Sequence, residues 1–425
     1  MVRNPGEEQR TSPGLRNFSV MKPTVYILYH FFHPDTVVSA ELKKGLAQGL
    51  VARGWDVTVV TSNRFCRDQE AVIECLDEAW GGMRIIRVPR KQYDQRSMLG
   101  RLKNSYVIQR GWLTKLKQLP APDALILGTD PQFSQLMLPS LRRIYPSTKL
   151  GLWVFDLYPE ILEAQKSRWI SLGAKLLRRL LKRFYRPVDL IADIGPCMKQ
   201  RLRDYAPGAV RETLVPWALA ESETGGVVDA GVRAELFGDA KVGVLYSGTI
   251  GQAHTFDKFL ELARLMRRKH ASVAFCFAGH GNRYAEVEAM VDPSDTNIRF
   301  VGFCPLSELG KRLSAADFHM ISLKEGWEGT VVPSKFFGAL AAGRPVLYDG
   351  APGSDIGIWI RELNLGFNLG SESLESIAKE MNKLGECPEH LKSWQGRVLD
   401  SYQKNFSYDR ELERWDQVLR LTLER

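Results

Sequence analysis

Apolar runs and amphipathic segments alternate along most of the chain. Residues 24–32 (TVYILYHFF) form a nearly continuous apolar run, residues 39–54 (SAELKKGLAQGLVARG) place apolar side chains at helical spacing, and residues 56–62 (DVTVVTS) are again apolar. Apolar runs without alternation predict parallel strands that are buried on both faces. The same order continues to residue 195, and it predicts a doubly wound parallel sheet of the Rossmann-like α/β class.

A second series of the same kind begins near Val242 and continues to residue 350. Residues 215–231, between the two series, contain glycines and few residues suited to a core, which is typical of a linker. The last part of the chain is helical and charged. We therefore expect a polar, disordered tail (1–21), a first domain (22–215), a second domain (216–395) and a terminal helical segment (396–425).

Composition and charge change this picture at a few points. The 425 residues carry a net charge of +9, and a clustered excess of basic residues would favour phosphates or anionic lipids. The six cysteines form no CxxC pair, which argues against structural zinc or a disulfide framework and favours reduced thiols in a cytoplasm. The first 20 residues lack the apolar core of a signal peptide, and no apolar run of about 18 residues predicts a membrane-spanning helix.

The loops that follow the predicted strands are the places to search for a ligand site. Ligands of doubly wound sheets bind at the carboxyl ends of the strands. In the second series these loops contain Gly248 and Gly251, then Gly279-His280-Gly281, then Gly302-Phe303. Glycines in a strand-to-helix turn let backbone N–H groups approach a phosphate, although a plain tight turn uses the same residues. The second of these loops is not a GxGxxG, so a dinucleotide fingerprint is only weakly supported.

Lys335 occupies an unusual position for a lysine, the first turn of a helix predicted within residues 331–343 (VVPSKFFGALAAG). Pro333 or Ser334 opens this helix, since serine is a common cap and proline suits the first turn. A cation there opposes the helix dipole, at a cost of a few tenths of a kcal/mol, unless an anion binds beside it. A diphosphate would supply that anion. The alternative is a solvated surface lysine, and the strand-end location favours the phosphate site.

Two polar positions in the first series are also candidates. His30 and His33 follow the first strand, but no acidic cluster is spaced to complete a metal site, so we interpret them as a polar loop that lines a cleft. Asp156 follows the strand pattern LGLWVF. Its carboxylate could meet a sugar hydroxyl, take part in proton transfer, or cap the next helix.

Residues 166–186 contain eight basic residues and no acid. The apolar residues at helical spacing in this stretch are Trp169, Leu172, Leu176, Leu180 and Phe184. A basic amphipathic helix of this kind suits an anionic membrane surface. The alternative is that the apolar stripe is buried against the sheet. Helices of doubly wound domains bury one face, which favours this alternative for the stripe. The one-sided charge favours the membrane. Aromatic residues interleaved with base-reading residues are not evident, so nucleic acid is the weakest of the three interpretations.

The order of these motifs resembles that of GT-B glycosyltransferases of family GT4 over residues 22–420, and most of all the branch that makes bacterial surface polysaccharides. The motifs that carry the resemblance lie at residues 30–62, 155–160 (FDLYPE), 245–261 (LYSGTIGQAHTFDKFLE) and 331–350 (VVPSKFFGALAAGRPVLYDG). The resemblance implies two Rossmann-like domains that face each other across a cleft. It places the nucleotide-sugar in the second domain and the acceptor in the first, and it implies that the last helix returns to the first domain.

The resemblance also implies an activity. Members of the family transfer a sugar from a nucleotide diphosphate sugar, here UDP- or GDP-linked, with retention of configuration and without a metal ion or another cofactor. Positive groups and helix dipoles stabilise the leaving diphosphate. We therefore expect a cytoplasmic glycosyltransferase, peripheral on the inner face of the cell membrane, with a glycan or lipid-linked acceptor. The alternatives are a catalytically degenerate GT-B scaffold or subunit, and a nucleotide-sugar epimerase.

The chain departs from the family pattern in the donor site. Two glutamates that members usually carry correspond to Thr330 and Gly338, and a usual arginine and lysine correspond to Thr249 and His254. Lys335 then becomes the best remaining cation for the diphosphate, while Glu325 and Glu328 are candidates to replace the lost carboxylate. For catalysis we expect Lys335, Asp156 and His254. The expected donor contacts are Gly248, Thr249, Gly279, His280, Gly302, Phe303, Glu325, Pro333, Ser334 and Gly338.

Overall fold

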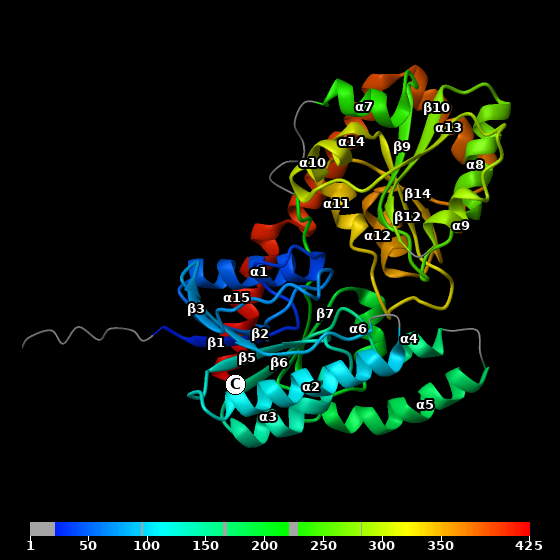
Figure 1. Cartoon of the computed structure of the whole chain (residues 1–425). Helices are drawn as coiled ribbons and strands as arrows, with labels where there is room; N and C mark the ends of the chain where they lie inside the picture. Colours follow the sequence, from blue (N-terminus) through cyan, green and yellow to red (C-terminus); the bar gives the residue numbers. More distant parts are fainter. Residues whose placement is uncertain (1–21, 95–96, 165–167, 221–227, 282) are drawn as a thin grey trace, which may run out of the picture.

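The structure, a computed structural model, describes residues 22–94, 97–164, 168–220, 228–281 and 283–425. Two parallel sheets, each covered by helices, form two domains, and the end of the chain runs from the second domain back to the first (Figure 1). The expected tail at 1–21 lies outside the described residues. The predicted doubly wound α/β architecture is confirmed.

The N-terminal domain is built on an eight-stranded sheet in the order β3-β4-β2-β1-β5-β6-β7-β8. Its neighbouring strands pair in parallel, except that β3 runs antiparallel to β4. The sequence patterns predicted six of these strands and missed β3 and β8. The strands are β1 (Thr24–Leu28), β2 (Asp56–Ser62), β3 (Asp77–Trp80), β4 (Met83–Val88), β5 (Ala124–Gly128), β6 (Lys149–Trp153), β7 (Leu190–Asp193) and β8 (Val210–Thr213).

Helices cover both faces of this sheet, and α1 shows why they form. Its apolar residues Leu42, Leu46 and Leu50 recur at helical spacing and are buried against the strands. The helices are α1 (Val38–Ala52), α2 (Met98–Leu116), α3 (Leu138–Ile144), α4 (Glu160–Glu163), α5 (Arg168–Lys182) and α6 (Pro196–Leu202), with short 3₁₀ turns η1 (Ser134–Met137) and η2 (Arg183–Tyr185).

The C-terminal domain contains a six-stranded parallel sheet in the order β11-β10-β9-β12-β13-β14. The strands are β9 (Val242–Thr249), β10 (Val273–His280), β11 (Ile298–Val301), β12 (Phe318–Ser322), β13 (Val346–Asp349) and β14 (Gly366–Asn368). The helices are α7 (Ala230–Phe237), α8 (Asp257–Arg268), α9 (Tyr284–Glu288), α10 (Leu306–Ala315), α11 (Lys335–Ala341), α12 (Asp355–Leu363) and α13 (Leu374–Glu386). Short loops at the carboxyl ends of these strands face the N-terminal domain.

Two helices at the end of the chain join the domains. In α14 (Pro388–Asn405), Trp394 donates to the carbonyl of Asn364 in the C-terminal domain. In α15 (Tyr408–Glu424), the Tyr408 hydroxyl donates to the carbonyl of Gly45 in α1, and Trp415 packs against Trp153 of β6. The chain therefore crosses between the domains near residue 406, and α15 is the helix that packs on the first domain.

Direct contacts also join the two sets of strand-end loops. The backbone N–H of Leu157 donates to the carbonyl of Thr330 (3.0 Å), and the N–H of Cys197 donates to the Asp355 carboxylate (2.8 Å). Arg201 donates to the carbonyl of Glu328 (2.6 Å). These contacts hold the carboxyl ends of both sheets against each other.

Two expectations need correction. Residues 215–220 are not a loose linker, because Trp217 is buried and its ring lies 5.1 Å from that of Tyr408. The apolar stripe of α5 does not face the sheet: Leu172, Leu176 and Leu180 expose 63, 62 and 47% of their surface, and the helix buries Ala174 and Leu181 instead. Among the described residues, none of the helices is both long and apolar enough to span a bilayer.

Candidate active site

Glycines bring the loops after β9 and β10 into direct backbone contact. Gly248, Gly279 and Gly281 have φ values of 132°, 149° and 144°, a region that residues with a Cβ rarely adopt. A Cβ on Gly279 would lie 2.1 Å from the carbonyl oxygen of Gly248, and one on Gly281 would lie 2.3 Å from that of Ile250. Only glycine therefore allows these two loops to pack together at the edge of the cleft.

Lys335 packs onto this glycine loop. A Cβ on Gly248 would lie only 2.7 Å from Lys335 Cε. The Lys335 ammonium lies 5.2 Å from the centre of the Tyr246 ring. The ammonium also lies 3.5 Å from His254 Nε2. Burial lowers the pKa of Lys335 to about 8. The lysine is thus a constrained cation at the strand ends, where the sequence placed it.

His254 holds Lys335 and adds no positive charge of its own. Its Nδ1 donates to the carbonyl of Ser322 (2.8 Å), so Nε2 carries the lone pair that accepts from the Lys335 ammonium. Burial, and then the charge of Lys335, lower the pKa of His254 to about 3. The imidazole is neutral at physiological pH, and it orients the lysine.

Ser334 directly precedes α11 and occupies the N-cap position, as expected, but its hydroxyl does not cap the helix. Ser334 has helical backbone angles (φ −61°, ψ −20°) and its side chain makes no cap hydrogen bond. The carbonyls of Pro333 and Ser334 instead accept from Phe336 N and Phe337 N in a tight first turn. Because Ser334 already lies within this turn, its hydroxyl is exposed while Pro333 is buried.

The other expected donor residues lie at the carboxyl ends of β9 and β10 and directly after β11. Thr249 pairs with His280 in the β9–β10 ladder, and both are exposed. The His280 ring meets the Phe303 ring edge to face at 5.1 Å, and Phe303 is 54% exposed. Arg67, from the N-terminal domain, places its guanidinium 5.1 Å from the Phe303 ring. Gly302 is exposed and its carbonyl accepts from Arg312 on α10.

The acidic candidates are not brought to Lys335. The carboxylate of Glu328 accepts twice from Gly326 N, at 3.1 and 3.0 Å, and so stabilises its own loop. Glu325 is exposed on that loop. Thr330 is fully buried at the domain contact, and a Cβ on Gly338 would touch Leu313 at 3.4 Å. The two positions that carry glutamate in the family are therefore parts of the packing in this chain.

A cleft of about 560 Å³ lies between the two domains. Its lining from the N-terminal domain includes Met98 and Leu102 of α2, Asp156 and Tyr158 after β6, and Leu177 of α5. The C-terminal domain contributes residues 251–254, Trp327 and Val331. Apolar side chains thus form much of the wall, with Asp156 and His254 among its polar groups.

Asp156 stands in the wall of this cleft at the carboxyl end of β6. Its backbone N–H donates to the Thr129 hydroxyl (3.3 Å), which ties the ends of β5 and β6 together. Its side chain keeps contact with the cleft. Burial and, to a smaller extent, the charge of Asp130 raise the pKa of Asp156 to about 6, while the charge of Lys43 opposes this rise. Helix α4, next along the chain, has no side-chain cap, so the capping interpretation of Asp156 is wrong.

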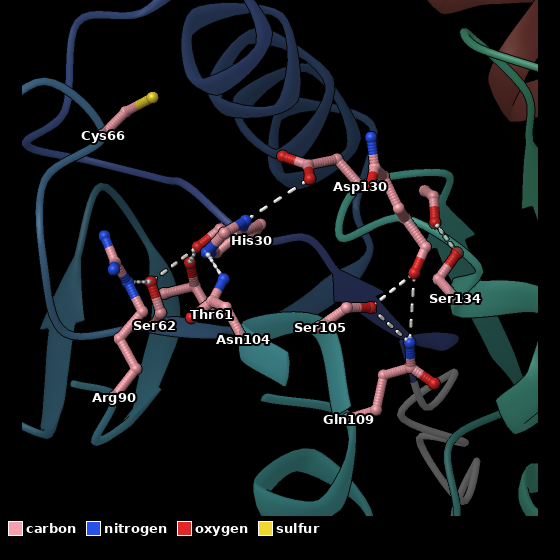
Figure 2. Close-up of polar contacts among 12 residues, drawn as sticks. His30, Thr61, Ser62, Cys66, Arg90, Asn104, Ser105, Gln109, Asp130 and Ser134 are labelled. Carbon is pink, nitrogen blue, oxygen red and sulfur yellow. Dashed lines mark hydrogen bonds and ion pairs between the residues drawn. The ribbon is translucent and has the colours of Figure 1, made fainter. Parts of the chain in front are cut away.

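Sequence reasoning named His30 but missed the polar residues that bind it. Figure 2 shows His30 with Asp130 on one side and Asn104 on the other. His30 Nδ1 donates to Asp130 (3.3 Å), and Asn104 donates to His30 Nε2 (3.4 Å). Asp130 follows β5 as Asp156 follows β6, so the same strand-end rule could have found it. Lys43, on the buried face of α1, is the other residue that was missed.

The second histidine of the first loop has a structural role, because His33 stacks on Trp80 at 3.9 Å. Within the part of the chain that the structure describes, no group of three or more His, Cys, Asp or Glu residues is arranged to hold a metal ion. The site therefore presents one constrained lysine and a glycine loop in the C-terminal domain, opposite a pair of aspartates in the N-terminal domain.

Comparison with known proteins bears on the family and on the fold. Residues 241–385 match the family model described as glycosyl transferases group 1. The chain is 26% identical over 302 residues to the probable glycosyltransferase WbjE of Pseudomonas aeruginosa, covering 70% of this chain and 74% of that protein.

Two solved structures share the whole fold. WaaG, a glycosyltransferase involved in lipopolysaccharide biosynthesis, superposes with a TM-score of 0.63 at 17% identity, covering 93% of this chain and 99% of WaaG. HepE of Anabaena, in complex with UDP-glucose, superposes with a TM-score of 0.62 at 10% identity, over 93% and 99% of the two chains. Residues 241–385 are thus similar to the group 1 glycosyl transferases, and the chain has the GT-B fold of these glycosyltransferases.

Proposed function

We propose that the protein transfers a sugar from a UDP- or GDP-sugar to a glycan or lipid-linked acceptor in surface polysaccharide synthesis, with retention of configuration and without a metal ion or cofactor. The observation that carries the proposal is the Lys335 ammonium, held by His254 against the glycine loop after β9. The donor class is supported by UDP-glucose in HepE, and the pathway by the lipopolysaccharide role of WaaG.

The donor diphosphate would bind between the glycine loop and Lys335. The left-handed glycines leave backbone groups of the loop uncovered by side chains, and such loops accept phosphate oxygens closely. Burial disfavours the ammonium of Lys335 until an anion is present, so diphosphate and cation stabilise each other. The neutral His254 fixes the direction of the lysine and does not compete for the diphosphate.

The reaction exchanges one bond to the anomeric carbon for another. The bond from this carbon to the diphosphate oxygen breaks with its electron pair on the diphosphate, and the acceptor hydroxyl oxygen forms the new bond on the same face. The hydroxyl proton passes to the departing diphosphate oxygen. Lys335 stabilises the negative charge that grows there, and Asp156 on the opposite wall binds the acceptor.

The Lys335→Ala variant should lose most turnover. Removing one preorganised charge from a developing oxyanion typically costs about 3 kcal/mol, on the order of a hundredfold in rate. Binding of nucleoside diphosphate should weaken far more than binding of nucleoside, and calorimetry measures both. Lys335→Arg should recover only part of the activity, because a planar fork replaces a point charge. Lys311→Ala, an exposed lysine on α10, is the matched control. Near-normal rate and diphosphate affinity in Lys335→Ala would refute the assignment.

Chelation should leave turnover unchanged. Lys335 supplies the charge that a divalent ion supplies in other enzymes, so excess EDTA removes nothing that the proposed reaction needs. The measurement is the initial rate of UDP- or GDP-sugar turnover with and without EDTA. A loss of rate that magnesium or manganese restores would contradict metal independence.

We also propose that α2 and α5 dock the protein on an anionic membrane beside the cleft. Both helices line the cleft, and α2, like α5, carries exposed apolar residues. Those residues, with their exposed fractions, are Met98 (52%), Leu99 (79%), Leu102 (36%), Tyr106 (60%) and Val107 (41%). Apolar and basic side chains on one surface favour an interface with anionic lipid. A lipid-linked acceptor would then reach the cleft from the bilayer.

Vesicle binding tests this surface. Replacing the exposed residues Lys175, Arg179 and Arg183 with glutamine should weaken binding to anionic vesicles on the order of 100-fold, since each basic residue contributes about 1 kcal/mol near such a surface. Arg178 and Lys182 stay unchanged, because Arg178 pairs with Glu163 and Lys182 lies over the Tyr205 ring.

The matched control replaces three exposed lysines of the C-terminal domain, Lys379, Lys383 and Lys392, with glutamine. This control changes the net charge equally and should keep most of the binding. Higher salt should weaken the wild-type interaction. Equal binding by wild type and the α5 variant at physiological salt would exclude this surface.

A further inference from the structure

A lysine is sealed inside the N-terminal domain, beneath the acceptor wall of the cleft. Lys43 is 1% exposed, and its ammonium lies 3.6 Å from the centre of the Trp153 ring and 3.7 Å from that of Phe155. The Tyr29 ring closes a third side at 4.6 Å. Among the described residues, no acceptor lies within hydrogen-bond distance of this ammonium.

This arrangement is unfavourable for the fold alone. The aromatic rings stabilise the cation in part, yet burial still lowers the pKa of Lys43 well below its ordinary value. An unfolded chain would leave the same lysine protonated in water, so below its ordinary pKa the buried site costs stability. A methionine would fill the space between three rings without that cost. The position of Lys43 on the apolar face of α1 therefore indicates a role outside packing.

Two carboxylates at the ends of adjacent strands offset part of the cost of burying the Lys43 cation. Asp130 and Asp156 are the groups whose charge favours the protonated form of Lys43. The Thr129 hydroxyl accepts from the backbone N–H groups of Phe155 and Asp156, which fixes the loop after β6 beside the loop after β5. His30 fixes the direction of the Asp130 carboxylate (Figure 2).

We propose that Lys43 is a positioning residue that keeps Asp156 negatively charged beside Asp130, where the acceptor hydroxyl binds. The acceptor position rests on the proposed function. Without a cation beneath them, two neighbouring carboxylates in a cleft wall would share a proton, because like charges disfavour each other. With Lys43 in place, both oxygens of Asp156 can accept from the hydroxyl groups of a sugar, and the site stays polar in a wall that is otherwise largely apolar.

Other titratable groups near the pair do not take over this role. They are Tyr29, His30, Cys66, Arg90, Tyr93, Arg101, Tyr158 and, across the cleft, His254. Burial raises the pKa of Cys66 and of Tyr93 to about 12, so both are neutral. The Arg90 guanidinium is bound by the carbonyl of Phe65 and by neighbouring acceptors. Lys43 is the cation whose charge lowers the pKa of Asp156.

Two substitutions should move the titration of Asp156 in opposite directions. Lys43→Met removes the cation and should raise the pKa of Asp156 from about 6 by on the order of one pH unit, whereas Asp130→Asn removes the like charge and should lower it. Lys44→Met, which removes a neighbouring lysine paired with Glu41 on α1, should leave it unchanged. The measurement is the carboxyl ¹³C titration of aspartate-labelled protein, with the Asp156 signal identified by its absence in Asp156→Asn.

Two further readouts separate this role from packing and from donor binding. Lys43→Met should unfold at a higher temperature than the wild type, since an unpaired buried charge is replaced by an apolar side chain. Its affinity for UDP or GDP should be unchanged, while the acidic limb of nucleotide-sugar hydrolysis, with water in place of the acceptor, should move to higher pH.

The outcomes are distinct. An unchanged Asp156 titration in both variants would overturn the proposal, and so would failure of Lys43→Met to fold or a lower unfolding temperature. If the Asp156 titration moved in Lys43→Met but the acidic limb of nucleotide-sugar hydrolysis did not, the acceptor role of the pair would be refuted. If the wild type bound no nucleoside diphosphate, the proposed function would fall, whereas the titration result for Lys43 would stand on its own.

Discussion

The C-terminal side of the cleft depends on one close contact, between the methylene chain of Lys335 and a glycine without a side chain. A Cβ on Gly248 would lie 2.7 Å from Lys335 Cε, too close for both atoms to keep these positions. The same loop touches the loop after β10 through Gly279 and Gly281, where backbone meets backbone. The lysine therefore has one place to lie, and His254 accepts from its ammonium there. A cation so constrained is already in position when charge develops on a leaving group.

The end of the chain packs against the helix that carries Lys335. Helix α11, which begins at Lys335, is packed by an aromatic cluster in which Phe406 lies 6.1 Å from Phe336 and 5.7 Å from Phe337, ring centre to ring centre. Phe406 is also the residue at which the chain leaves α14 and returns to the first domain. The packing that positions Lys335 is thus continuous with the packing that joins the domains, and Trp415 extends it to Trp153, which encloses Lys43.

Much of the fold follows from local patterns, whereas the site follows from contacts between distant segments. Parallel strands such as β1 and β9 could be predicted because apolar runs report burial on both faces. The edge strand β3 was missed because it is short and half exposed. The strand-end rule found Lys335 and Asp156, but the pairing of His30 with Asp130 joins residues 100 positions apart, and no local pattern encodes it. The direction of the apolar stripe of α5 was also predicted wrongly. Helical periodicity shows that a stripe exists, but it does not show whether the stripe faces the sheet or the solvent.

The central claim is that the ammonium of Lys335 receives the donor diphosphate. Burial holds the pKa of Lys335 at about 8 in the free protein, and a bound diphosphate should raise it again. Binding of a UDP- or GDP-sugar at pH 8 should therefore take up about half a proton. Calorimetry in buffers of different ionisation enthalpy measures this directly, because the nucleotide-sugar itself does not titrate there. We predict uptake in the wild type and none in Lys335→Ala; equal uptake in both, or none in the wild type, would contradict the account.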